Sequence, residues 1–170
     1  SDLVFLDESG CNTDMTRRYA YSLGGSRAVD SAPLSKTRNT TILSSIQLDG
    51  TLHYTTFSGG TTVERFKRYL ETDLLPHLNG DSILIMDNMK SHHAKAVKNL
   101  LDSSGVRYIY LPPYSPDLNP IEKLWSKVKS FLRKFKARTL DALPNAIQRA
   151  FQTVSPSDCS GWFKSCDYLH

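Results

Sequence analysis

Short apolar runs predict strands in the first part of the chain. Residues 3–6 are continuously apolar and end at Asp7, as expected for a strand that is buried on both faces and then enters a polar loop. Residues 40–48 and 51–57 are rich in β-branched and aromatic side chains, and Asp49-Gly50 lies between them. Because this dipeptide tolerates the positive φ angles of a two-residue turn, the two segments are predicted to form a β-hairpin.

Apolar residues at helical spacing begin after the hairpin. The first such pattern runs from Val63 to Leu75 and is ended by Pro76. A later helix has three start signals: Asn119 is a typical N-cap, Pro120 suits the first helical position, and Glu122 at the third position can reach back to the cap. By the same reasoning we predict strands over 82–86 and 106–111 and helices over 94–101, 121–135, 140–154 and 156–166.

This order of elements predicts an α/β domain with a mixed sheet. The 170 residues are 39% hydrophobic and 22% charged, which fits one globular domain.

The three cysteines lack a paired C-x-x-C spacing, which argues against a disulfide framework or a structural zinc site and favours a reducing compartment. No apolar run approaches the roughly 20 residues that span a bilayer, so we expect no membrane segment. The abrupt start in an apolar run suggests a fragment.

Three acidic residues stand at positions suited to chemistry. Asp7 and Asp87 each follow an apolar strand, and open α/β sheets bind ligands outside the carboxyl ends of their strands. Glu122 lies in the first turn of a helix, where the helix dipole favours an ionised carboxylate. Three converging anions repel one another unless hard cations neutralise them, and ligation by oxygen alone selects Mg²⁺ or Mn²⁺ over zinc. Taken singly, each acid is better explained as a turn or capping residue, and only the spacing of the three acids favours a shared site.

Three sequence blocks carry these acids. They are Phe5-Leu6-Asp7-Glu8-Ser9, Met86-Asp87-Asn88-Met89-Lys90-Ser91-His92, and Leu111-Pro112-Pro113-Tyr114-Ser115-Pro116-Asp117-Leu118-Asn119-Pro120-Ile121-Glu122. Together they resemble the signature blocks of DDE transposases of the mariner superfamily, in its bacterial insertion-sequence branch. The 34 residues between Asp87 and Glu122 are the interval typical of that branch. The terminal Gly161-Trp162-Phe163 is also similar to the usual ending of the family.

The resemblance implies a ribonuclease H-like fold over residues 1–170, in which an antiparallel meander and parallel strands form a mixed five-stranded sheet flanked by helices. It implies that Asp7, Asp87 and Glu122 bind two Mg²⁺ or Mn²⁺ ions and act on DNA phosphodiesters. The expected reaction is hydrolytic cleavage of transposon ends, followed by joining of the 3′-hydroxyl to target DNA that contains a TA dinucleotide. The resemblance further implies a homodimer in the synaptic complex and a bacterial cytoplasmic and nucleoid-associated protein. Members of the superfamily carry a helix-turn-helix region ahead of the catalytic domain; because no such region precedes Ser1, we expect it either to have been removed or to be supplied by a partner chain.

Further residues match the same blocks. Asn88 and His92 stand at family positions, which implies supporting roles near the metal or the scissile phosphate. His92 is equally explained as a cap of the helix that begins near Ala94. Trp125 lies on an apolar helical stripe and is predicted to be a core residue.

Basic residues are concentrated in the helix that Glu122 begins. Residues 123–138 contain seven of them and no acid: Lys123, Lys127, Lys129, Arg133, Lys134, Lys136 and Arg138. At 3.6 residues per turn, Glu122, Lys129 and Arg133 share one side of the helix. This arrangement predicts a positive track for a DNA phosphate backbone, and a solvated helix face is the alternative.

Two other functions stay open on the sequence alone. One is a catalytically decayed or domesticated relative that binds DNA or protein without cleaving it, and the presence of all three acids argues against it. The other is a different ribonuclease H-like nuclease, such as a junction resolvase or an RNA/DNA hybrid nuclease. The Pro-rich block over residues 112–116 argues against that second reading.

Overall fold

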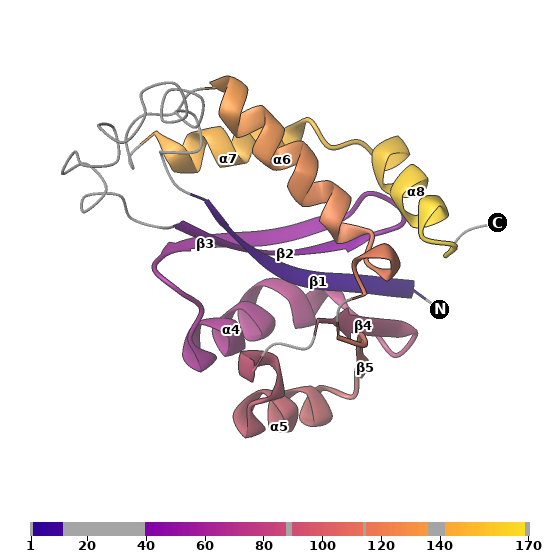
Figure 1. Ribbon diagram of the computed structural model, residues 1–170. Helices are drawn as coiled ribbons and strands as arrows, with labels where there is room; N and C mark the ends of the chain where they lie inside the picture. The colour runs from indigo at the N-terminus through magenta and orange to yellow at the C-terminus, as the bar shows by residue number, and fades with distance from the viewer. Residues whose placement is uncertain (1, 12–39, 88–89, 114, 136–141, 169–170) are drawn as a thin grey trace.

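A five-stranded sheet with strand order β3-β2-β1-β4-β5 forms the centre of the molecule (Figure 1). β1 pairs antiparallel with β2, and β2 with β3, whereas β4 runs parallel to β1 and β5 parallel to β4. The predicted mixed sheet, an antiparallel meander extended by parallel strands, is therefore confirmed. The strands are β1 (Asp2–Cys11), β2 (Thr40–Gln47), β3 (Leu52–Ser58), β4 (Ser82–Met86) and β5 (Arg107–Tyr110). This computed structural model describes residues 2–11, 40–87, 90–113, 115–135 and 142–168.

Helices cover both faces of the sheet (Figure 1). The helices on one face are α4 (Val63–Tyr69), continued by a π-helical turn (Leu70–Leu74) and a 3₁₀ turn (Leu75–His77), and α5 (Lys95–Ser104), preceded by a 3₁₀ turn (Lys90–His93). The other face is covered by α6 (Ile121–Phe135), preceded by a 3₁₀ turn (Pro116–Leu118), and by α7 (Leu143–Gln152) and α8 (Pro156–Ser165). All predicted helices that fall in the described ranges are confirmed, with α5 ending at Gly105 in the left-handed conformation.

The alternation of side chains along β1 divides the core into two halves. Phe5 packs with α6, α7 and α8 on one face. Val4 and Leu6 pack with α4 and α5 on the other face. Since successive side chains of a strand point to opposite faces, Asp7 falls on the same side as Phe5, toward α6.

The prediction that a polar loop begins at Asp7 is wrong. β1 continues to Cys11, and Asp7 is paired with Ser44 of β2. The cause is unequal strand length, because β4 stops at Met86, opposite Leu6, while β2 still pairs with residues 7–11. Among the described strands, β1 beyond Leu6 therefore has a neighbour on one side only.

The predicted hairpin is present, but its loop is longer than two residues. Gln47 N–H donates to the carbonyl of Thr51, and Gly50 N–H donates to the carbonyl of Gln47 at 3.0 Å. Gly50 has φ of +95°, so residues 48–50 form a three-residue loop in which the glycine supplies the left-handed position.

The start of α6 is largely as predicted. Asn119 Oδ1 accepts a hydrogen bond from Ile121 N–H at 3.3 Å, as an N-cap side chain does. The predicted return bond from Glu122 is not made, because the N–H of Asn119 donates to Pro116 at 3.1 Å instead. One member of the predicted apolar stripe, Phe135, is also 37% exposed and stacks on Phe131.

The remaining expectations concern cysteines and membranes. Cys11, Cys159 and Cys166 are buried and free. In the described part of the chain, every helix is too short or too polar to cross a membrane.

Candidate active site

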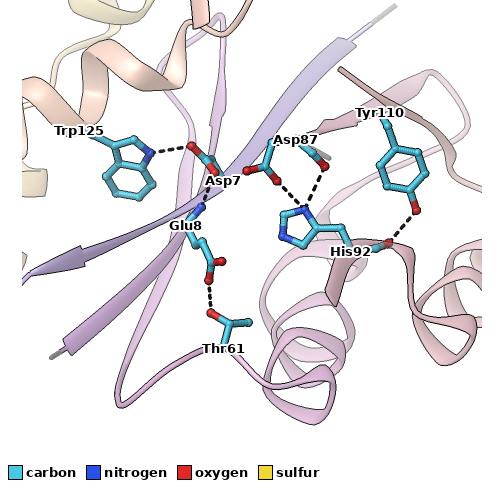
Figure 2. A network of polar contacts seen from close by, with 7 residues as sticks. All are labelled: Asp7, Glu8, Thr61, Asp87, His92, Tyr110 and Trp125. Carbon is cyan, nitrogen blue, oxygen red and sulfur yellow. Dashed lines mark hydrogen bonds and ion pairs between the residues drawn. The ribbon is translucent and has the colours of Figure 1, made fainter. Parts of the chain in front are cut away.

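The parallel register of β1 and β4 brings two acids together. Leu6 pairs with Met86, so the next residue on each strand is an aspartate, and both fall on the face that α6 covers. Asp7 and Asp87 are in side-chain contact, and their carboxyl groups face each other (Figure 2). Asp7 is 5% exposed, whereas the side chain of Asp87 is 30% exposed. The pair is therefore buried on one side and open to solvent on the other.

Burial and mutual repulsion control the charge of this pair. Loss of hydration on burial, followed by the nearby charge of Asp87, raises the pKa of Asp7 to about 8. Hydrogen bonds from the backbone N–H of Glu8, at 2.8 Å, and from Trp125 act in the opposite direction. Without a cation, the Asp7 carboxyl group consequently favours its protonated form at neutral pH.

Trp125 is a site residue that sequence analysis assigned only to the core. Its indole Nε1 donates a hydrogen bond to Asp7 Oδ2 at 3.1 Å, and the ring is 5% exposed (Figure 2). A signal was present in the sequence, because a buried tryptophan needs an acceptor for its N–H group and every other residue of its stripe is apolar. The identity of that acceptor depends on the packing of α6 against β1.

His92 holds the second acid. Its Nδ1 lies 2.7 Å from Asp87 Oδ1 and 3.3 Å from the backbone oxygen of Asp87, so the Nδ1 proton is donated to this residue (Figure 2). The ring is fully buried and stacks on Phe66, with centroids 4.3 Å apart. The alternative that His92 caps α5 is wrong, since that helix begins after Ala94 without a side-chain cap. The imidazole orients the Asp87 carboxylate.

Glu8 is next to Asp7 but serves the opposite face of the sheet. Its carboxylate accepts a hydrogen bond from Thr61, just before α4 (Figure 2). Alternation along β1 thus separates two adjacent acids, and only Asp7 joins the pair.

Glu122 is exposed on the first turn of α6. It is not gathered with Asp7 and Asp87: within the described residues, no three His, Cys, Asp or Glu side chains lie close enough to hold a metal ion. The turn that carries Glu122 is nevertheless attached to the pair, because Trp125 follows it by three positions and bonds to Asp7. Within the described residues, the Glu122 carboxylate makes no hydrogen bond to the Asn119 N–H, which donates to the carbonyl of Pro116.

The basic residues of α6 fall on two faces rather than one. Lys129 and Arg133 follow Glu122 by seven and eleven positions and share its side. Lys129 also lies near the end of β1, close to Cys11. Burial raises the pKa of the Cys11 thiol to about 11, and the positive charge of Lys129 partly offsets this effect. The lysines 123, 127 and 134 instead line a groove between α6 and α8. Asn88, Lys136 and Arg138 lie outside the described residues.

Comparison with known proteins agrees with this geometry. The family model described as "DDE superfamily endonuclease" matches residues 2–144. The chain belongs to this family. The DDE domain is 27% identical over 97 residues to the Tc1 transposase of Caenorhabditis elegans, covering 55% of the domain and 36% of that protein. It is 32% identical over 71 residues to the Tcb2 transposase of Caenorhabditis briggsae, covering 42% of the domain and 26% of that protein. The chain thus spans about a third or less of these curated relatives, which are Tc1/mariner-type transposases.

Solved structures show the same fold. The catalytic domain of Mos1 mariner transposase superposes on the DDE domain with a TM-score of 0.71 at 18% identity, covering 98% of this chain and 78% of that one. The catalytic core domain of BIV integrase superposes with a TM-score of 0.58 at 15% identity, covering 98% of both chains. The fold of the DDE domain is therefore ribonuclease H-like, as the resemblance implied.

Proposed function

We propose that this DDE domain is the catalytic domain of a DNA transposase of the bacterial insertion-sequence branch of the mariner superfamily. It cleaves transposon ends by phosphodiester hydrolysis and joins the freed 3′-hydroxyl to target DNA containing TA. The observation that carries the proposal is the contact between Asp7 and Asp87, which lie just beyond the last residue pair (Leu6 with Met86) of the parallel pairing between β1 and β4. The matches to Tc1 and Tcb2 transposases support the same reaction class.

The donor set fits divalent cations. Burial and the charge of Asp87 raise the affinity of the Asp7 carboxyl group for a proton, and a hard cation that replaces this proton relieves the repulsion between the two groups. We assign Asp7, Asp87 and Glu122 as the residues that hold two Mg²⁺ or Mn²⁺ ions. When bound, such ions activate the attacking oxygen and stabilise the leaving oxygen of the phosphodiester. Solved structures of the Mos1 catalytic domain are described with Mg and with Mn, which supports this class of cofactor.

The protein side chains have distinct tasks in this proposal. Trp125 positions the Asp7 carboxylate through its indole N–H, and His92 positions that of Asp87. Such outer hydrogen bonds fix the direction in which a carboxylate presents its oxygens to a cation. Glu122, on the first turn of α6, is assigned as the third ligand of the cations; in this structure it is not gathered with Asp7 and Asp87. Asn88, whose position matches the family block, has a supporting role beside Asp87.

DNA is the partner that the charges of α6 favour. Lys129 and Arg133 extend from the Glu122 side of the helix and offer a track for the phosphate backbone of a transposon end. Solved structures of Mos1 transposase include a paired-end complex with a transposon end, which supports DNA as the partner. We further propose a homodimer at synapsis. We assign the reading of the terminal repeats to a helix-turn-helix region, either joined to this domain or on a separate chain, and the protein itself to the nucleoid of the bacterial cytoplasm.

Nicking of supercoiled plasmid DNA tests the function. We expect nicking in Mn²⁺ or Mg²⁺ that EDTA abolishes. The substitution Asp87→Asn removes it because a neutral amide cannot neutralise a cation. The matched control is Asp81→Asn, the same change at an exposed position before β4. Nicking by Asp87→Asn at the wild-type rate, with the fold intact by circular dichroism, contradicts the proposal.

A further inference from the structure

A groove of about 640 Å³ lies between α6 and α8, and the carboxylate pair does not contribute to its lining. Lys123, Lys127, Ser130 and Lys134 follow each other at intervals of four, three and four positions, so they form a single row on α6. This row is about 16 Å long at 1.5 Å per residue. It lies on a different side of the helix from Glu122, Lys129 and Arg133.

The groove is positively charged and rigid on one side. It contains three lysines against one acid, Asp158. Asp158 accepts hydrogen bonds from Lys127 and from the backbone N–H of Ser155, which closes the capping box of α8. Lys127 is thereby fixed in the wall of the groove. Lys123 and Lys134 are exposed and, within the described residues, form no ion pair, so their charges are available to a ligand.

Aromatic side chains complete the lining. Phe131 of α6 and Trp162 of α8 both line the groove, and each is half-buried because one side of it packs against the core. Lysines that follow a backbone, combined with aromatic rings on which bases stack, are the two elements of sites that bind single-stranded nucleic acid. A volume of this size is that of a small-ligand pocket.

We propose that the groove between α6 and α8 binds single-stranded DNA, with Lys123 and Lys134 on phosphates and Trp162 against a base. The inference rests on the proposed function only for the choice of DNA as the nucleic acid. It adds a second DNA site on the face of α6 away from the carboxylate pair. A strand separated from its complement near the cleavage site is the form of DNA that this groove accepts.

The test measures binding without cleavage. A fluorescein-labelled oligo(dT), on the order of 12 nucleotides long, is titrated with the protein in EDTA, and anisotropy is recorded across a range of salt concentrations. We expect Lys123→Glu with Lys134→Glu to weaken binding at least tenfold at low salt. Loss of two phosphate contacts also makes the slope of log K (the binding constant) against log salt concentration less steep by roughly 1.4. The matched control, Arg68→Glu with Arg107→Glu, makes the same charge change at exposed positions on α4 and β5 and leaves binding unchanged.

Two further measurements separate this inference from the proposed function. Asp87→Asn, which stops nicking, is expected to bind oligo(dT) as the wild type does. Trp162→Phe preserves a stacking ring and is expected to bind better than Trp162→Leu. Equal loss in the groove variant and the charge control, or absence of oligo(dT) binding by the wild type, overturns the inference. A failure of nicking alone leaves it standing.

Discussion

The indole Nε1 of Trp125 donates to Asp7 Oδ2 across 3.1 Å, joining residues 118 positions apart in the sequence. This bond attaches the first turns of α6 to the strand that carries the buried acid. Glu122 lies on the same turn, so the position of the third acid depends on the same contact. A residue that sequence analysis assigned to the core is thus a positioning residue of the candidate active site.

Replacing Trp125 by Phe keeps an aromatic ring but removes the donor. The hydrogen bond lowers the pKa of Asp7, so its loss raises that pKa further and weakens cation binding at a given pH. We expect nicking to fall by about 10- to 100-fold, the range seen for outer-sphere partners of metal ligands, and the activity profile to shift to higher pH. A loss of activity without a shift of the pH profile contradicts a positioning role and indicates a packing defect.

The acid pair predicts how cations and pH affect stability. Burial and Asp87 raise the pKa of Asp7 from 3.8 to about 8, so the folded state holds this proton more tightly than the unfolded state does. The contribution of the protonated Asp7 to the free energy of unfolding is therefore full below about pH 4 and is lost as pH rises through about 8. A divalent cation binds the deprotonated pair, so its stabilising effect increases over the same range. Thermal melts in Mn²⁺ and in EDTA between pH 6 and 9 measure this difference.

The size of the cation effect follows from binding linkage. A cation at 100 times its dissociation constant adds about 2.7 kcal/mol, which corresponds to a rise of roughly 5–10 °C in Tm for a chain of this size. Asp7→Asn is expected to abolish both the rise and its dependence on pH. A Tm rise that persists in this variant places the cation elsewhere.

His92 is predicted to act through Asp87. In His92→Asn the amide Nδ2 occupies the place of imidazole Nδ1 and preserves a donor to the carboxylate, whereas His92→Leu removes it. We expect the Leu variant to lose about 10- to 100-fold in cation affinity, with partial recovery in the Asn variant. Isothermal titration with Mn²⁺ measures the affinities. Equal affinities of the Asn and Leu variants show that only the packing of His92 on Phe66 matters.

Lys129 and Arg133 are predicted to bind duplex DNA beside the carboxylates. Changing both to Glu removes two phosphate contacts, which lowers the slope of log K against log salt by roughly 1.8 for a duplex. Duplex binding weakens, while oligo(dT) binding at the groove between α6 and α8 changes little. An unchanged duplex slope means that this side of α6 is a solvated surface.

The sequence by itself determined the elements of the fold. Apolar periodicity and turn residues located the five strands and the helices of the described ranges, because hydrophobic spacing, Gly50 at a positive φ angle and the Asn119 cap act within a few residues. The acids at positions 7 and 87 were identified as a candidate pair for the same reason, since each follows an apolar run.

Only the tertiary structure decided which groups meet. The continuation of β1 beyond Asp7 depends on the length of its neighbour β4, and the partner of the Trp125 indole depends on how α6 crosses the sheet. The division of the α6 lysines between the Glu122 side and a groove depends on where α8 packs. These are contacts between distant segments, and local patterns of hydrophobic and polar residues do not specify their geometry.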